Sequence, residues 1–250
     1  MSGPLFRFGG PLTVGSIVDL DGDDGHHAAS VRRMRVGESI QLTNGRGTRA
    51  SGIVTSVERR GLSIEVRQVV LEAEPSLRLT LVQAIAKGDR DELAIQAATE
   101  LGVTSIVPWQ SERTVSRWDG KEAKGRERWQ SIVDEAAKQS LRVWFPQVQE
   151  IRDSKGLAEL VERLVIDGSD VFILDPTAQT GLARQVSKFD PKNASVAVIV
   201  GPEGGISTAE LEQLSNAGAK RAHLGTGILR TSTAGMAALA LLIGQSGGWD

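Results

Sequence analysis

Two glycine-rich turns near the C-terminus contain the residues best suited to chemistry. The first, Gly201-Pro202-Glu203-Gly204-Gly205, directly follows the apolar run Val196–Val200. The second is Leu224-Gly225-Thr226-Gly227-Ile228-Leu229-Arg230-Thr231. Glycine allows a backbone to adopt positive φ and to approach a ligand closely, and ligands of open α/β sheets bind at the carboxyl ends of strands. Both turns are therefore candidate ligand sites, and a tight strand-to-helix turn without a ligand is the alternative.

Each turn contains one charged residue that limits what the turn can do. Glu203 lies in the first turn, where a carboxylate at the ligand edge of a sheet is either solvated or takes part in chemistry. Arg230 ends the second turn, just before an apolar helix predicted over residues 231–243. A cation at a helix N-terminus opposes the helix dipole. We therefore expect Arg230 to have an anionic partner, either a protein carboxylate or a ligand.

Common nucleotide and metal motifs are missing from the sequence. Neither G-x-G-x-x-G nor G-x-x-x-x-G-K-[ST] occurs, which argues against a dinucleotide fingerprint and a P-loop. The chain has no cysteine, and its histidines (His26, His27 and His223) lack metal-binding spacing, so no metal site is expected. No signal peptide and no apolar run of membrane-spanning length is visible, and the lack of cysteine suits a reducing cytosol. A cytoplasmic protein without membrane contact is expected.

The charge balance leaves only local basic clusters for contact with nucleic acid. The chain has 29 Lys and Arg against 31 Asp and Glu, so it has no global positive field. Arg32, Arg33 and Arg35 crowd one short segment after His27, and the planar fork of arginine suits phosphate. A solvated helical face is the alternative. The basic residues within 113–128 alternate with acids, which predicts a mixed exposed surface, and five Trp plus five Phe are too few for a base-stacking platform.

The elements that position these residues fall into two predicted domains. Residues 1–72 are predicted to form a small β-barrel, with strands within 12–20, 39–43, 49–57 and 62–70. Asn44-Gly45 predicts a hairpin turn, since both turn positions favour positive φ. One short helix, capped by Asp23 or Asp24, is predicted to include Ala28 through Met34. The polar segment around Pro75 marks the domain boundary.

Residues 76–250 are predicted to form an α/β domain on a parallel sheet. Strands are expected over 77–85, 105–108, 171–174, 195–200 and 221–224. Helices are expected over 89–101, 129–141, 155–165, 208–217 and 231–243. The last helix is apolar on nearly all sides and must be covered on nearly all sides. Either a second copy of the chain or the helix at 129–141 is expected to supply the second layer.

Five ordered motifs, spread over nearly the whole chain, point to one protein family. The two glycine-rich turns, with Thr233-Ala234 after the second, form the most specific pair. The others, in chain order, are His27 with Val31-Arg32-Arg33-Met34 and Val36-Gly37; Glu92 with Glu100-Leu101-Gly102-Val103 and Glu112-Arg113; and Trp129 with Glu135-Ala136-Ala137, Gln139-Ser140, Arg142 and Pro146. Together they resemble the RsmE family of SPOUT-class methyltransferases. Thr226-Gly227 stand where that family often has Pro-Arg, and Ser232 where it often has Glu, so contacts of those side chains are not carried over.

The resemblance implies a fold, a cofactor and partners. It implies a PUA-like β-barrel RNA-binding domain before a SPOUT domain with a C-terminal trefoil knot, S-adenosylmethionine as methyl donor, no metal, and a homodimer. The implied substrate is one uridine of 16S ribosomal RNA. It is expected to be methylated at N3 within the assembled small ribosomal subunit, during ribosome biogenesis. The cofactor contacts it implies come from Leu174, Gly201, Pro202, Gly204, Gly205, Leu224, Gly225, Ile228, Leu229 and Thr231. The RNA contacts it implies come from His27, Arg32, Arg33, Arg35 and Arg113.

Two residues are candidates for the catalytic role in such a reaction. The imide nitrogen of uridine is protonated at neutral pH, so a base or a stabiliser of the anion is needed. Glu203 is a candidate to accept the proton, and Arg230 is a candidate to stabilise negative charge on O2 or O4; the sequence leaves both open. Two other functions remain as alternatives: methylation of a ribose 2′-OH in another RNA, and RNA binding by a relic that has lost its cofactor.

Overall fold

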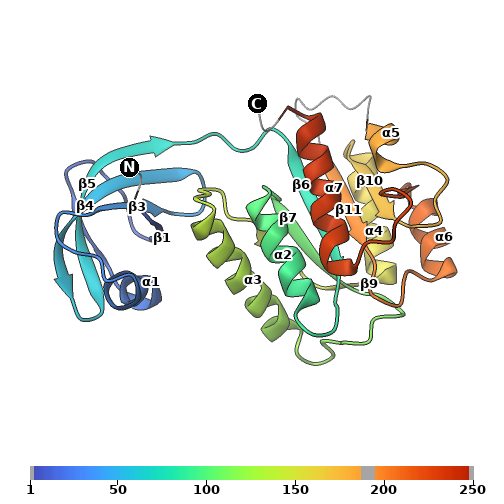
Figure 1. Ribbon diagram of the computed structural model, residues 1–250, viewed down its shortest axis with the longest axis horizontal. Helices are drawn as coiled ribbons and strands as arrows, with labels where there is room; N and C mark the ends of the chain where they lie inside the picture. The colour runs from blue at the N-terminus through green and yellow to red at the C-terminus, as the bar shows by residue number, and fades with distance from the viewer. Residues whose placement is uncertain (1–2, 187–194, 248–250) are drawn as a thin grey trace. The chain divides into compact units, whose positions relative to one another are not determined.

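A computed structural model describes residues 3–186 and 195–247 of the chain, and these residues form two compact units (Figure 1). The first unit consists of Met1–Glu74 together with Ala137–Phe145, and the second of Pro75–Ala136 and Pro146–Asp250. The division after Glu74 lies within the polar segment marked by Pro75. The inclusion of Ala137–Phe145 in the first unit has no counterpart in the sequence analysis.

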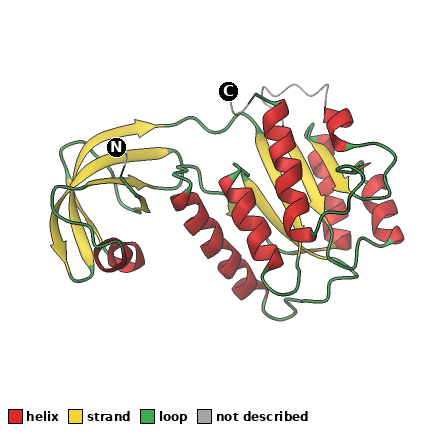
Figure 2. Ribbon diagram, viewed as in Figure 1, coloured by secondary structure: helices red, strands yellow, loops and turns green. Residues whose placement is uncertain are grey.

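The first unit is built on a mixed five-stranded sheet in the order β1-β3-β4-β5-β2. Figure 2 draws the strands of both units in yellow and the helices in red. Its strands are β1 (Leu5–Arg7), β2 (Ile17–Leu20), β3 (Ser39–Thr43), β4 (Thr48–Glu58) and β5 (Gly61–Leu71). β1 pairs with β3 in parallel, and the other pairs are antiparallel. The predicted strands are present, although β2 starts later than expected and β1 was not predicted. The predicted hairpin joins β3 and β4, but its turn differs from the one expected: Gly45 (φ 73°) and Gly47 (φ 89°) have positive φ and Asn44 does not.

The predicted N-terminal helix is shorter than expected and its predicted cap is wrong. Helix α1 (Gly22–His26) continues into one π-helical turn, η1 (His27–Val31), and ends there. Asp21 holds the N-cap position without a side-chain hydrogen bond. Asp23 and Asp24 are not the cap because the helix begins at Gly22 and both lie in its first turn; the Asp24 carboxylate accepts hydrogen bonds from the backbone N–H of Arg7 and from Lys138 Nζ. The arginines at 32, 33 and 35 therefore follow the helix and are not on a helical face.

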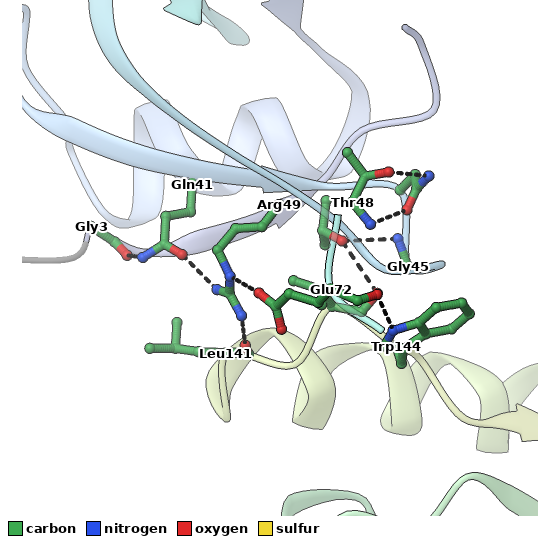
Figure 3. Close-up of polar contacts among 11 residues, drawn as sticks. Gly3, Gln41, Gly45, Thr48, Arg49, Glu72, Leu141 and Trp144 are labelled. Atoms are coloured by element: carbon green, nitrogen blue, oxygen red, sulfur yellow. Dashed lines mark hydrogen bonds and ion pairs between the residues drawn. The ribbon is translucent and has the colours of Figure 1, made fainter. Parts of the chain in front are cut away.

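Residues Ala137–Phe145 are held to the first unit by a polar network (Figure 3). The Arg49 guanidinium donates hydrogen bonds to Glu72 Oε1, to Gln41 Oε1 and, at 2.9 Å, to the carbonyl of Leu141. Trp144 Nε1 donates to the Glu72 carbonyl at 3.1 Å. Leu141 itself has φ 57°, so the predicted helix at 129–141 ends before it, at Gln139.

The second unit contains a sheet in which every pairing is parallel, which confirms the predicted sheet type. Its main order is β12-β10-β11-β6-β7-β8, and β9 also pairs with β7. The strands are β6 (Arg78–Ala84), β7 (Ser105–Gln110), β8 (Gln147–Val148), β9 (Arg152–Asp153), β10 (Asp170–Leu174), β11 (Ser195–Val200) and β12 (Lys220–Ala222). β11 is buried on both faces, as its uninterrupted apolar sequence predicted.

Helices cover both faces of this sheet. They are α2 (Arg90–Glu100), α3 (Glu122–Gln139), α4 (Ser154–Ile166), α5 (Leu182–Val186), α6 (Thr208–Asn216) and α7 (Thr231–Gln245). α2, α3, α5 and α7 contribute to the core on one face, and α4 and α6 to the core on the other. α7 crosses β6 and β11, and α2 packs along it (Figure 1). α7 lies close to β6 at Gly235, where an added Cβ would stand 3.0 Å from Leu81 Cδ1.

The described residues include no helix that is long and apolar enough to cross a membrane.

Candidate functional site

A pocket of about 540 Å³ opens at the carboxyl ends of three adjacent strands of the second unit. Its walls are the segments that follow β10, β11 and β12, and the start of α7. This is where open parallel sheets bind ligands, because the loops at that edge are free of strand pairing. The volume lies in the range of small-molecule sites.

The pocket brings together nearly all residues that the sequence analysis assigned to the cofactor. All of them except Gly204 line it: Leu174, Gly201, Pro202, Gly205, Leu224, Gly225, Ile228, Leu229 and Thr231. Both catalytic candidates, Glu203 and Arg230, line it as well. The two glycine-rich turns are thus two walls of one cavity.

Gly204 lies outside the pocket lining, unlike its neighbour Gly205. A Cβ at Gly204 would stand 3.1 Å from both Cβ and the carbonyl oxygen of Arg113, whose guanidinium donates a 3.3 Å hydrogen bond to the Gly204 carbonyl. Gly204 is therefore needed for close packing of the first turn on Arg113. Arg113, expected to contact RNA, lies against the outside of this turn.

Glycine is required at the pocket wall at two positions. Gly205 has φ 71° and Gly225 has φ 125°, and no atom lies within 4 Å of the place where a Cβ would stand at either. Side chains there would be strained and would project into open space at the pocket lining. With the apolar walls supplied by Leu174, Val200 and Ile206, this cradle fits a nucleoside-sized ligand.

Thr231 ties the two turns together. Its hydroxyl donates to the Gly201 carbonyl at 2.8 Å and accepts from Gln83 Nε2 at 2.9 Å. Thr231 is the first residue of α7, Gly201 follows β11, and Gln83 belongs to β6. One buried hydroxyl therefore fixes the start of α7 against the first glycine-rich turn and the centre of the sheet.

Glu203 is held by residues before α2 and at its start. Arg90 Nη1 lies 2.9 Å from Glu203 Oε1, and the backbone N–H of Lys87 donates to the same oxygen at 3.2 Å. Burial raises the pKa of the Glu203 carboxyl, but hydrogen bonds from its own backbone N–H, from Arg90 and from Lys87 outweigh this effect and lower the pKa. Such a carboxylate stays ionised and is a weak proton acceptor.

Arg230 is exposed at the N-cap position of α7. Within the described part of the chain it forms no ion pair with a carboxylate. Of the two partners expected from its place at a helix N-terminus, the protein carboxylate is therefore not found there. The guanidinium adds positive charge to the pocket lining.

Further pocket residues that lie at the carboxyl end of a strand were not predicted from the sequence. Asp175, Pro176 and Thr177 directly follow β10 and line the pocket, yet only Leu174 was chosen from this segment. Asp175 accepts hydrogen bonds from Thr177 and from Arg221. Burial raises the pKa of Asp175, but these hydrogen bonds outweigh it and lower the pKa. The Asp-Pro-Thr turn after a buried strand was the available signal.

His223 and Arg90 are further lining residues that were not predicted. His223 Nδ1 accepts a 3.0 Å hydrogen bond from the backbone N–H of Gly225, which fixes the beginning of the second turn. Arg90 lies more than a hundred residues before its partner Glu203. No local pattern in the sequence pointed to either contact.

The RNA-contact candidates of the first unit lie in and after η1. Met34 is buried in the core between Arg33 and Arg35, which are both exposed, and Arg33 has φ 54°. Arg32 Nη2 donates to Gln139 Oε1 at 3.4 Å. His27 is half-buried, with its ring edge-to-face against Phe6 at 5.9 Å, so it packs as well as facing solvent.

Among the described residues no group of three or more His, Asp or Glu side chains is placed to hold a metal ion. The basic stretch at 113–128 is largely a mixed surface, as predicted. In it Arg117 pairs with Asp119 at 2.8 Å, and Arg128 pairs with Glu92.

Comparison with known proteins agrees with both units. Residues 73–243 match the family model described as an RNA methyltransferase domain, and residues 20–67 match an RNA methyltransferase PUA domain. Ribosomal RNA small subunit methyltransferase E of Mycobacterium bovis is 39% identical over 239 residues, covering 94% of this chain and 89% of that protein. The protein of the same name from Bacillus subtilis is 32% identical over 235 residues, covering 91% of this chain and 90% of that protein.

A solved structure extends the similarity to three dimensions. Ribosomal RNA small subunit methyltransferase E from Neisseria gonorrhoeae, bound to S-adenosyl methionine, superposes with a TM-score of 0.85 at 32% identity and 97% coverage of both chains. The expected fold class, a PUA-like domain before a methyltransferase domain on a parallel sheet, is confirmed. The chain belongs to the RsmE family of RNA methyltransferases.

Proposed function

We propose that this protein transfers a methyl group from S-adenosylmethionine to N3 of one uridine in 16S ribosomal RNA. The observation that carries the proposal is that both glycine-rich turns line one pocket at the carboxyl ends of β10, β11 and β12. Family membership supports the RNA substrate, and the relative from Neisseria gonorrhoeae is bound to S-adenosyl methionine. The protein is expected to act in the cytoplasm, where ribosomal subunits are assembled.

The pocket residues suit this methyl donor. Backbone groups of Gly205 and Gly225 would border the ligand where side chains are excluded, and Leu174, Ile228 and Leu229 would supply apolar contacts. When bound, the donor supplies an electrophilic methyl carbon on a sulfonium. The chain positions the acceptor nitrogen in line with that carbon, and positioning of this kind supplies much of the rate enhancement.

We assign Arg230 to binding of the uracil ring that accepts the methyl group. Attack by N3 needs a uracil that has lost its imide proton, and negative charge then develops on O2 and O4. The exposed guanidinium of Arg230, at the pocket lining, is suited to stabilise that charge. This would also account for a cation at a helix N-terminus that has no carboxylate partner among the described residues.

The basic turn after η1 is proposed to contact RNA phosphates. Arg33 and Arg35 are exposed, and buried Met34 anchors the turn between them. Replacing Arg33 and Arg35 by Ala should weaken binding of the small ribosomal subunit. The slope of log K against log salt concentration should become shallower by about two. Cofactor affinity should not change. An unaltered salt slope would identify the turn as a solvated surface.

We also propose that the protein is a homodimer formed through the outer face of α7. The positions of α7 that the core leaves half-exposed are small or apolar: Thr233, Met236, Ala237, Ala240 and Leu241. A surface helix with such a face is suited to a two-fold mate. Sedimentation equilibrium at micromolar concentration should give a dimer for the wild type and a monomer for Ala240→Glu. A wild-type monomer that is fully active would refute the dimer.

The function is tested by mass spectrometry of ribosomal RNA from a deletion strain complemented with this chain. The proposal predicts that 3-methyluridine is absent in the deletion strain and returns on complementation. Appearance of a 2′-O-methyl group would favour the ribose methyltransferase. Calorimetry with S-adenosylmethionine tests the remaining alternative, because a relic that only binds RNA should not bind the cofactor.

A further inference from the structure

The ion pair between Arg90 and Glu203 lies within the pocket wall itself. Both residues line the pocket, and Arg90 Nη1 lies 2.9 Å from Glu203 Oε1. Just under half of the Arg90 side chain stays exposed (46%) although it is paired. One side of the guanidinium is thus fixed by Glu203, and the other nitrogens remain available to a ligand.

The other ionisable groups of the described pocket lining, Asp175, His223 and Glu203, already accept hydrogen bonds from the protein. Asp175 accepts from Thr177 and from Arg221. His223 uses Nδ1 to accept from the Gly225 N–H, so the proton of the neutral ring is on Nε2. Glu203 accepts from Arg90 and from the Lys87 N–H. The hydrogen bonds to Glu203, from Arg90 and from the Lys87 N–H, both end on Oε1 and favour the ionised carboxylate, which suits a group that positions Arg90.

The positive groups are placed differently. Arg90 begins α2, and Arg230 immediately precedes α7, so the two guanidiniums reach the lining from different elements. Arginine stays protonated throughout the physiological pH range, so neither residue can serve as a base. Both can donate hydrogen bonds to oxygen atoms that carry negative charge.

We infer that Arg90 is a second catalytic residue, positioned by Glu203, and that Arg90 and Arg230 together bind the target uracil as its N3 anion. The inference rests on the function proposed above. It assigns Glu203 to positioning, in place of the proton-accepting role that the sequence left open. Arg90 would donate to one carbonyl oxygen of the uracil, and Arg230 to the other.

The reaction balances without a protein base. The N3–H proton passes to water, and the negative charge spreads over N3, O2 and O4. The N3 lone pair then forms the bond to the methyl carbon while the C–S bond breaks and its electron pair stays on sulfur, which becomes a neutral thioether. Two positively charged side chains at the pocket lining lower the free energy of the anion.

The test is single-turnover methyl transfer to the small ribosomal subunit across pH, with calorimetry of S-adenosylmethionine for each variant. Arg90→Ala should lower the rate about 10-fold to 100-fold, with little change in cofactor affinity. Arg90→Lys should recover part of the rate because the charge remains. Arg117→Ala, which removes an exposed arginine paired with Asp119, is the matched control and should leave the rate unchanged.

The pH profile separates the two roles of Glu203. If uracil ionises to water, the wild-type rate rises with pH, and Glu203→Gln reduces the rate less than Arg90→Ala does and keeps that rise. If Glu203 is the base, Glu203→Gln causes the larger loss of rate. The rate then also loses the part of its pH dependence that comes from ionisation of the Glu203 carboxyl. That result, or a normal rate for Arg90→Ala, would overturn the inference. A wild-type enzyme that forms no 3-methyluridine would instead refute the proposed function.

Discussion

The two glycine-rich turns border the same pocket, yet they differ in how the protein holds them. The first turn is fixed at several points: Glu203 by Arg90, the Gly204 carbonyl by Arg113 and the Gly201 carbonyl by Thr231. It leads into α6 through a capping box formed by Ser207 and Glu210. Three of its five residues, Gly201, Glu203 and Gly204, are therefore hydrogen-bonded to other segments of the second unit.

The second turn has few such contacts. Residues from Gly225 to Arg230 are exposed, and Ile228 keeps 80% of its surface accessible. Over the described chain, Thr226, Gly227, Ile228 and Leu229 make no hydrogen bond; the turn is attached at its ends, through His223 to Gly225 and through Thr231.

This difference indicates a division of roles within one site. A turn with many internal contacts is preorganised, so its shape costs little when a ligand binds. A turn with exposed apolar side chains and few hydrogen bonds gains contacts from the ligand or from a partner surface. We therefore expect substitutions in the first turn to affect the pocket strongly and substitutions in the middle of the second turn to affect it weakly.

The largest effect is expected from Gly205→Val. Valine at φ 71° costs about 1–2 kcal/mol in backbone strain, and its methyl groups would project at the pocket wall. Affinity for S-adenosylmethionine, measured by calorimetry, should fall about 100-fold. Gly204→Ala is the control: its Cβ would face Arg113, so it should lower the Tm and change affinity much less. Equal losses of affinity in both variants would contradict the placement of Gly204.

Thr231→Val should affect both stability and affinity, because it cuts the tie between the two turns. The Gly201 carbonyl and Gln83 Nε2 would each lose a hydrogen-bond partner in a buried place, at a cost of about 1–3 kcal/mol. Chemical denaturation should report that loss, and calorimetry a fall in cofactor affinity of about 10-fold. Thr231→Ser keeps the hydroxyl and should be close to wild type. A stable Thr231→Val protein would show that the tie is unimportant.

A smaller effect is expected from His223→Leu, which removes the acceptor for the Gly225 N–H. The net value of such a hydrogen bond is about 0.5–1.5 kcal/mol, which corresponds to roughly 2-fold to 10-fold in cofactor affinity. In His223→Asn the side-chain oxygen can stand near the place of Nδ1, so affinity should recover in calorimetry. Failure of Asn to improve on Leu would assign the effect to the ring and not to its acceptor.

The smallest effect is expected from Gly227→Ala. No atom lies within 4 Å of the added Cβ, and the backbone at Gly227 is outside the positive-φ range. The change in unfolding free energy should stay within about 0.5 kcal/mol. Affinity for S-adenosylmethionine should also stay near that of the wild type. A loss of affinity like that of Gly205→Val would mean that the middle of the second turn is as constrained as the first.

Much of the second unit could be predicted because its signals are local. The apolar run at 196–200 predicted a strand buried on both faces, and the glycines after it predicted a ligand-bearing turn. Because ligands of open sheets bind at the carboxyl ends of strands, the two turns were expected to form sites at the same edge, although residues 206–223 separate them. The same rule applied to Asp175 would have added the third wall. Local pattern and chain topology were sufficient for this part.

The first unit shows where local patterns mislead. The apolar spacing that suggested a helix through Met34 is real, since Ala28 and Met34 are both buried. The backbone nevertheless leaves the helix at Val31, and Arg33 takes a left-handed conformation. Burial of Met34 in the sheet core decides that path, and core contacts of this kind override helix propensity.

The sequence by itself determined most of the longer helices and strands, the parallel sheet and the two turns that carry the pocket, because periodicity and glycine placement act over a few residues. Only the tertiary structure decided which distant side chains meet. Arg90 pairs with Glu203, and Arg49 reaches the carbonyl of Leu141, across about a hundred residues in each case. Such contacts form only when folding brings distant segments of the chain together. The free energy that selects one arrangement comes from packing of the whole unit.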